Sequence, residues 1–149
     1  MQWDGGTNGG FSTAAPEHLY AALIQDPVYG YPAVNVLRQE ASEHSFLNWM
    51  RSIIMVRRST RVFGTGSIEF LHPANHRILA YVRRLGNEAV LVVNNLSSTA
   101  QAVELDLRRY KGNILIEMSG KNMFPRVGDL PYLLTMGPYQ FYWFWLRRI

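Results

Sequence analysis

The chain has 149 residues, 48% hydrophobic and 17% charged, which is typical of one globular domain rather than a disordered segment. It contains no cysteine, which excludes disulfides and thiolate metal sites and fits a cytoplasmic protein. The net charge of +4 is spread along the chain, and no apolar run reaches the roughly 20 residues that cross a bilayer. We therefore expect neither a nucleic acid nor a membrane as partner.

The first 41 residues hold most of the glycines and prolines and show no helix or strand pattern. They open with MQWDGGTNGGFSTA, where Trp3, Asp4, Asn8 and Phe11 lie among glycines. A glycine-rich run with an aromatic ring, a carboxylate and an amide is typical of a loop that lines a site. Because unstructured loops beyond about 12–15 residues are uncommon in compact domains, residues 1–41 are interpreted as a functional loop of a larger body or a flexible tail.

Residues 43–59 are predicted to form a helix. Ser42 or Ser45 can cap its start, since a serine hydroxyl accepts from the free amides of the first turn. Arg57 and Arg58 favour the C-terminal end of the helix dipole. Apolar side chains recur at the i, i+3, i+4 and i+7 spacing of one face, at Phe46, Leu47, Met50, Ile53 and Ile54. The stripe is wide, so we expect it to pack against a partner on more than one side.

After Arg61 the hydrophobic period changes from 3.6 to 2, which predicts strands. We expect them at residues 67–72, 77–84, 88–96, 100–106, 114–118, 132–136 and 139–146. Turn-forming residues separate them, including Gly86-Asn87, which suits a tight hairpin. Short strands joined without helices predict an antiparallel β-sandwich. The fold class is therefore mainly β, with one α-helix and an irregular N-terminal loop before the sandwich.

The last predicted strand, YQFYWFWL, is apolar on both faces. Such a strand most often fills a core or a domain interface, and we interpret it in that way. Stacking of its rings, or of Trp3 and Trp49, on a sugar is the alternative.

No motif in the chain assembles a catalytic centre. Sugar hydrolysis or transfer needs paired carboxylates in a cleft, and no acidic residue lies in a motif that gives it such a partner. Glu104 and Asp106 alternate with apolar residues and are expected on the solvated face of a strand, whereas Asp4 and Asp26 lie in loops. The four histidines lack metal-binding spacing, and no nucleophile or phosphate-binding motif is present. We expect no metal and no cofactor.

Five long stretches together resemble the C-terminal part of trehalose synthases, enzymes of the α-amylase superfamily (glycoside hydrolase family 13) that isomerise maltose to trehalose. They are MQWDGGTNGGFS, DPVYGYPAVNV (26–36), LNWMRSIIMVRR (47–58), FGTGSIEFLHPANHRILAYVRR (63–84) and LPYLLTMGPYQFYWFWL (130–146). The resemblance covers nearly the whole chain in order.

The resemblance implies that residues 1–61 are a remnant of a catalytic (β/α)8 barrel, with the loop 1–41 and the last barrel helix 43–59. Residues 62–149 would be the C-terminal β-sandwich of the amylase type. The loop would lie near the mouth of the barrel, where active sites of such enzymes are built, so Trp3 and Asp4 are candidate sugar-binding residues. The catalytic carboxylates of the family lie on earlier strands, and a barrel needs about 250 residues, so no catalytic residue is assigned here.

Three functions remain open from the sequence. The first is an accessory domain of trehalose synthase that supports the barrel, is inactive alone, and meets maltose and trehalose only through the parent enzyme. The second is a stand-alone carbohydrate-binding module. The third is a protein-interaction module, which could include association with a second copy of the chain. Whether the chain is natural, truncated or cut, and whether a maltokinase accompanies the parent, also stays open.

Overall fold

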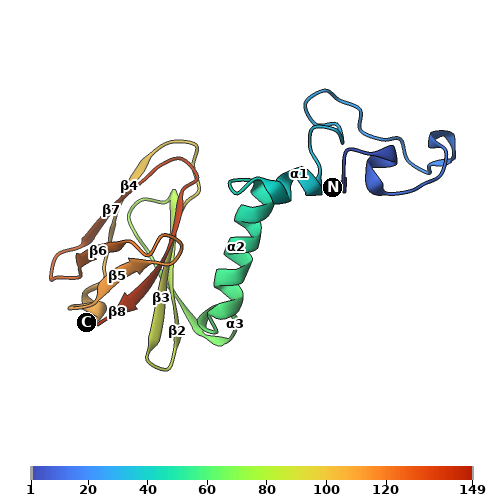
Figure 1. Ribbon diagram of the computed structural model, residues 1–149. Coiled ribbons are helices and arrows are strands. Elements are labelled where there is room, and N and C mark those ends of the chain that lie inside the picture. Colours follow the sequence, from blue (N-terminus) through green and yellow to red (C-terminus); the bar gives the residue numbers. More distant parts are fainter. Residues whose placement is uncertain (1, 149) are drawn as a thin grey trace. The chain divides into compact units, whose positions relative to one another are not determined.

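The computed structural model describes residues 2–148 and divides into two compact units, with the boundary between Met55 and Val56. The N-terminal unit holds loops and helices, coloured blue to teal in Figure 1, and the C-terminal unit holds the strands, coloured green to red.

The N-terminal unit is more regular than predicted. Two short 3-10 turns, η1 (Thr7–Gly10) and η2 (Pro16–His18), are followed by a helix, α1 (Val36–Ala41), in the stretch expected to be irregular. The buried Asn35 caps α1, because its side-chain oxygen accepts from the amide of Arg38 at 2.8 Å. A six-residue helix is too short to show hydrophobic periodicity, which is why the sequence pattern did not reveal it.

The predicted long helix is present as α2 (Phe46–Ser59), which crosses from the first unit into the second. It begins three residues later than expected. Ser45 is the capping residue of the two that the sequence offered, since its hydroxyl accepts from the amide of Asn48 at 3.2 Å.

The C-terminal unit contains a one-turn helix, α3 (Val62–Thr65), followed by the strands. The strands are β1 (Ser67–Leu71), β2 (Ile78–Leu85), β3 (Glu88–Asn95), β4 (Gln101–Leu105), β5 (Ile114–Glu117), β6 (Met123–Arg126), β7 (Tyr132–Met136) and β8 (Phe141–Arg147). A short 3-10 turn, η3 (Arg108–Tyr110), follows β4. Every predicted strand is found, with ends shifted by a few residues.

The strands form two antiparallel sheets, as expected for a sandwich. One sheet has six strands in the order β1-β2-β3-β8-β5-β6, and the other pairs β4 with β7. The predicted tight turn at Gly86-Asn87 joins β2 to β3, where Leu85 pairs with Glu88. Gly86 has a φ of +56°, which glycine adopts without strain.

One strand, β6, was not predicted. It contains Pro125, which has no amide hydrogen to donate to a neighbouring strand, so the segment lacks a typical strand pattern. The structure places β6 at the edge of the large sheet, the position in which proline is tolerated, and its pairing with β5 shifts register between Ile114 and Leu115.

The hydrophobic core of the sandwich lies between the two sheets. It gathers the inward side chains of both sheets, among them Leu91, Val93, Leu134 and Phe144. The opposite face of the large sheet forms a second cluster, in which Val90 and Val92 pack with Val62 of α3, Trp143 and Trp145. Because β8 contributes to both clusters from an interior position of the sheet, its apolar character on both faces is explained by packing.

Candidate functional site

The two candidate sugar-binding residues, Trp3 and Asp4, lie in a loop whose backbone is held in place. The amide of Trp3 donates to the carbonyl of Gly9 at 2.8 Å, and the Trp3 indole is 57% exposed. The half-buried Asp4 accepts from the amide of Gly6 at 2.8 Å through Oδ1. The loop therefore presents one exposed aromatic ring next to a carboxylate, a pair of groups that can stack on a sugar ring and accept from its hydroxyls.

The glycines of this loop allow it to fold back on Trp3 and Asp4. Asn8, Gly9 and Gly10 all have positive φ values, of 53°, 61° and 76°. A Cβ atom at Gly10 would lie 2.7 Å from Asp4 Oδ2 and 2.9 Å from Trp3 Cβ, so a side chain there would displace both residues. The buried Asn8 holds the turn through its Nδ2, which donates to the carbonyls of Ser12 (2.9 Å) and Ala14 (2.7 Å).

The same segment is attached to the start of α1. The amide of Val36 donates to the carbonyl of Gln2 at 2.8 Å, and the amide of Leu37 donates to the carbonyl of Trp3 at 3.0 Å. These amides have no partner within the helix, so the loop backbone satisfies them. Asn35 adds a further connection, because its Nδ2 donates to the carbonyl of Tyr31 at 2.8 Å.

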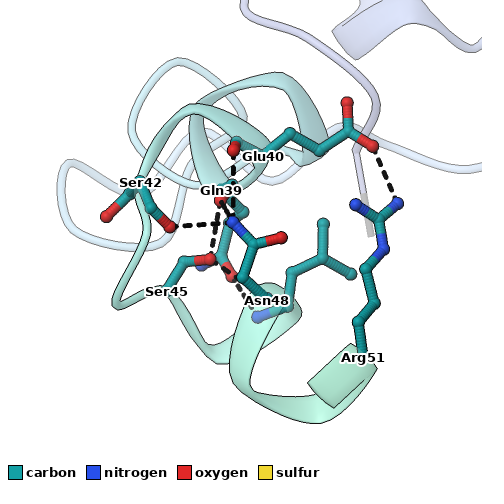
Figure 2. A network of polar contacts seen from close by, with 7 residues as sticks. Gln39, Glu40, Ser42, Ser45, Asn48 and Arg51 are labelled. Atoms are coloured by element: carbon teal, nitrogen blue, oxygen red, sulfur yellow. Dashed lines mark hydrogen bonds and ion pairs between the residues drawn. The ribbon is translucent and has the colours of Figure 1, made fainter. Parts of the chain in front are cut away.

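The end of α1 is attached to α2 by a polar network, shown in Figure 2. The Nδ2 of Asn48 donates to the carbonyls of Gln39 (3.1 Å), Glu40 (3.1 Å) and Ser42 (2.9 Å). The Ser45 hydroxyl donates to the carbonyl of Gln39 at 2.6 Å, and an ion pair joins Glu40 to Arg51 at 2.7 Å. The sequence analysis missed Asn48, because a polar residue on the solvent side of an amphipathic helix gives no signal for such a role.

The described part of the N-terminal unit, residues 2–55, has no buried apolar side chain. Among residues 2–55 the buried ones are Gln2, Asn8, Gly9, Gly30 and Asn35, which are polar residues or glycine. Large apolar side chains are exposed instead, among them Trp3, Phe11, Tyr20, Ile24, Val28, Tyr29, Leu37, Phe46, Trp49, Ile54 and Met55. Hydrogen bonds therefore hold this unit together, and its apolar surface is left uncovered.

Asp26, the second loop carboxylate, also has a local structural role. Its Oδ1 accepts from the amides of Val28 and Tyr29, each at 2.8 Å, and so shapes a turn. The turn explains the presence of an aspartate at this position without a role in chemistry.

The sandwich contains a charged groove of about 930 Å³ along β1, β4 and the residues that follow β4. Three of the carboxylates that line it form ion pairs: Asp106 with Arg108 (2.6 Å), Glu69 with Arg109 (3.0 Å) and Asp129 with Lys111 (2.6 Å). Glu104 and Asp106 are exposed while Val103, Leu105 and Leu107 are buried, which confirms the predicted alternation.

Arg108 holds Asp106 of this groove in its ionised form. The hydrogen bonds from the Arg108 side chain and from its backbone amide lower the pKa of Asp106 to about 2. Such a carboxyl group is ionised at neutral pH and cannot serve as a proton donor there.

Within residues 2–148, no group of three or more histidine and acidic side chains is arranged to hold a metal ion. No helix in this described part of the chain is both long and apolar enough to span a membrane.

The chain is similar in sequence and fold to parts of known enzymes. The chain is 48% identical to a trehalose synthase of Pimelobacter sp. over 97% of its length, and 46% identical to the trehalose synthase/amylase TreS of Mycobacterium tuberculosis over 98%. It spans about a quarter of the length of these relatives. The crystal structure of a trehalulose synthase from Pseudomonas mesoacidophila MX-45 superposes with a TM-score of 0.70 and 26% identity, over 98% of this chain and 24% of that one.

The family relationship rests on the sandwich. Residues 68–143 match the family described as Maltogenic Amylase, C-terminal domain, and this range runs from β1 to β8. The match includes both sheets and the strand β6 that the sequence pattern did not indicate. The chain belongs to the maltogenic amylase C-terminal domain family, in the form found in trehalose synthase and amylase-type enzymes.

Proposed function

We propose that the chain is the C-terminal accessory part of a trehalose synthase, which interconverts maltose and trehalose, and that it supports the catalytic barrel without contributing a catalytic residue. The observation that carries this proposal is the uncovered apolar surface of residues 2–55, a unit with no apolar core of its own. Burying apolar surface contributes about 25 cal/mol per Å², so a unit of this kind gains most of its stability from a partner. The barrel of the parent enzyme is that partner.

The helix α2 supports the same proposal. Its apolar face carries Phe46, Met50 and Ile53, yet no residue of the helix is buried. Amphipathic helices gain most of their stability by packing the apolar face against a neighbour. We assign α2 to the outer layer of the barrel, where such a face would be covered.

The local contacts of five carboxylates support the proposal that the chain contributes no catalytic residue. Asp4 and Asp26 accept from local backbone amides, and Glu69, Asp106 and Asp129 pair with cations on the sandwich. Each of these carboxylates is held by a local partner. In the proposed arrangement, Trp3 and Asp4 contact the sugar at the mouth of the barrel, and the chemistry belongs to carboxylates of the barrel itself.

A chimeric enzyme tests this proposal. In the chimera, this chain replaces the matching quarter of the Pimelobacter trehalose synthase. We expect the chimera to convert maltose to trehalose, and we expect both the pure chain and the Pimelobacter enzyme without that quarter to be inactive. Trehalose formed by the pure chain would contradict the non-catalytic role. A folded chimera without activity would contradict the assignment to trehalose synthase.

The exposed apolar surface also favours a second candidate, association of the chain with itself. Sedimentation of the pure chain distinguishes the two. A homodimer that protects Trp49 and Met55 from solvent, and that does not dissociate when the barrel of the parent enzyme is added, would favour self-association. A dimer that dissociates when the barrel is supplied would favour the accessory role.

A further inference from the structure

The short helix α1 is held by partners outside itself at both ends. At its start, the amides of Val36 and Leu37 donate to the carbonyls of Gln2 and Trp3. At its end, the side chain of Asn48 on α2 donates to the carbonyls of Gln39, Glu40 and Ser42 (Figure 2). A continuous path of hydrogen bonds therefore runs from α2 through α1 to the segment Gln2–Asp4.

A helix as short as α1 depends on these external bonds. Isolated helices below about 12–15 residues are marginal in water, because few internal hydrogen bonds offset the ordering of the backbone. Apolar packing does not replace the missing bonds, since none of the residues of α1 is buried. The position of α1 is thus set by its terminal hydrogen bonds.

Asn48 provides more of these bonds than any other side chain in the network of Figure 2. Its amide group has two hydrogens and faces three carbonyl oxygens within 3.1 Å, so at least one hydrogen is shared between two acceptors. These oxygens belong to the last turn of α1 and to the residue that follows it. The Gln39 carbonyl also accepts from the amide of Ser42 (3.3 Å), and the Ser42 carbonyl also accepts from the amide of Ser45 (3.0 Å), so Asn48 adds the bonds that connect this end of α1 to α2. Ser45 contributes one bond to the same turn, and the Glu40–Arg51 ion pair is exposed to solvent and correspondingly weak.

We propose that Asn48 is a positioning residue, which acts through α1 to hold the Gln2–Asp4 segment, and with it Trp3 and Asp4, in the place required for sugar binding. This inference rests on the proposed function, because it assumes that the segment lies at the mouth of a trehalose synthase barrel. Asn48 itself touches no substrate in this arrangement. Its effect on sugar binding is transmitted by backbone hydrogen bonds.

The test uses the chimera described above with Asn48→Asp, which is nearly the same size but places a carboxylate, unable to donate, against three carbonyl oxygens. Asn48→Ala serves as a second, milder variant if the aspartate variant does not fold. The control is Ser52→Ala on the same helix, because the Ser52 hydroxyl donates only within α2, to the carbonyl of Trp49 at 2.7 Å. Backbone hydrogen exchange, kcat and KM for maltose are measured for each.

We expect Asn48→Asp to speed exchange at the amides of Trp3, Val36 and Leu37, which lie outside the network itself, while the sandwich strands keep wild-type exchange. We expect KM for maltose to rise about tenfold with a smaller change in kcat, because a displaced binding group weakens substrate binding first. Ser52→Ala should match the wild type in all three measurements.

Two results would overturn the positioning role of Asn48. One is hydrogen exchange that changes only within residues 39–48, which would show that Asn48 stabilises only the connection between α1 and α2. The other is faster exchange at Trp3 and Leu37 with an unchanged KM, which would show that the segment does not bind substrate. A folded chimera that makes no trehalose even without substitution contradicts the proposed function instead, and exchange at Trp3 and Leu37 in that chimera still decides whether Asn48 acts through α1.

Discussion

Asn95 connects two turns of the sandwich from a buried position. Its Nδ2 donates to the carbonyls of Thr99 (2.7 Å) and Gly137 (2.8 Å), and its Oδ1 accepts from the amide (3.0 Å) and hydroxyl (2.8 Å) of Ser97. The residue is 2% exposed, so its side-chain amide group is shielded from competing water. It fixes the turn between β3 and β4 against the turn that leads into β8.

Replacing this residue should reduce stability. In Asn95→Ala the carbonyls of Thr99 and Gly137 lose a donor, and we expect a loss of about 2–3 kcal/mol in the free energy of unfolding. Urea denaturation of the wild type and the variant measures this loss. Ser98→Ala, an exposed position in the same turn, is the control and should change stability by less than about 0.5 kcal/mol. Equal stability of the two variants would show that Asn95 does not hold the turns together.

The ion pair between Asp106 and Arg108 predicts a pH dependence. The folded-state pKa of Asp106, about 2, is below its ordinary value of 3.8, so folding favours the ionised carboxylate. The resulting stabilisation is present above pH 4 and is lost as the pH falls through about 2. Carbon NMR of the Asp106 carboxyl group should give this pKa directly.

In Arg108→Gln we expect the pKa of Asp106 to rise toward its ordinary value, since the largest cause of the shift is the hydrogen bond from the Arg108 side chain. Arg109→Gln is the matched control, because Arg109 pairs with Glu69 instead. A pKa of Asp106 that stays unchanged in Arg108→Gln would contradict this assignment.

At the scale of the elements, the short sheet of β4 and β7 closes the core on one side. Along β7 the side chains of Tyr132, Leu134 and Met136 are buried, and those of Leu133 and Thr135 are exposed. The two leucines provide a matched pair, since Leu134 is 4% exposed and Leu133 is 61% exposed. They differ in the face of the sheet on which they lie.

We expect Leu134→Ala to lower the free energy of unfolding by about 2–5 kcal/mol, because it removes buried methyl groups and leaves a cavity. Leu133→Ala should change it by less than about 0.5 kcal/mol. Chemical denaturation of both variants checks the register of β7. A larger loss for Leu133→Ala than for Leu134→Ala would mean that β7 pairs with β4 in a different register, because a shift by one residue exchanges the two faces of the strand.

The elements also show what the sequence could and could not predict. The strands were found from period-two alternation, which is strong where one face is buried, as in Val103, Leu105 and Leu107. The edge strand β6 was missed because Pro125 contradicts the usual strand pattern, and α1 was missed because its order depends on partners distant in sequence. The role of Asn48 could not be predicted for the same reason. Trp3 and Asp4 stay predictions, which the chimera tests.

At the scale of the whole molecule, the two units differ in how they are stabilised. The sandwich has an apolar core on each side of its large sheet, whereas residues 2–55 rely on backbone and side-chain hydrogen bonds and expose their apolar side chains. Hydrogen bonds contribute only about 0.5–1.5 kcal/mol each in net terms, so the N-terminal unit is expected to open easily without a partner. The sandwich is expected to fold without one.

Hydrogen exchange along the whole chain, compared between the pure protein and the chimera, tests whether residues 2–55 depend on a catalytic barrel for their stability. We predict rapid exchange throughout residues 2–55 in the pure protein, strong protection of the same residues in the chimera, and equal protection of the sandwich strands in both. Residues 2–55 that are as well protected in the pure protein as in the chimera would contradict the claim that this unit is stabilised by a catalytic barrel.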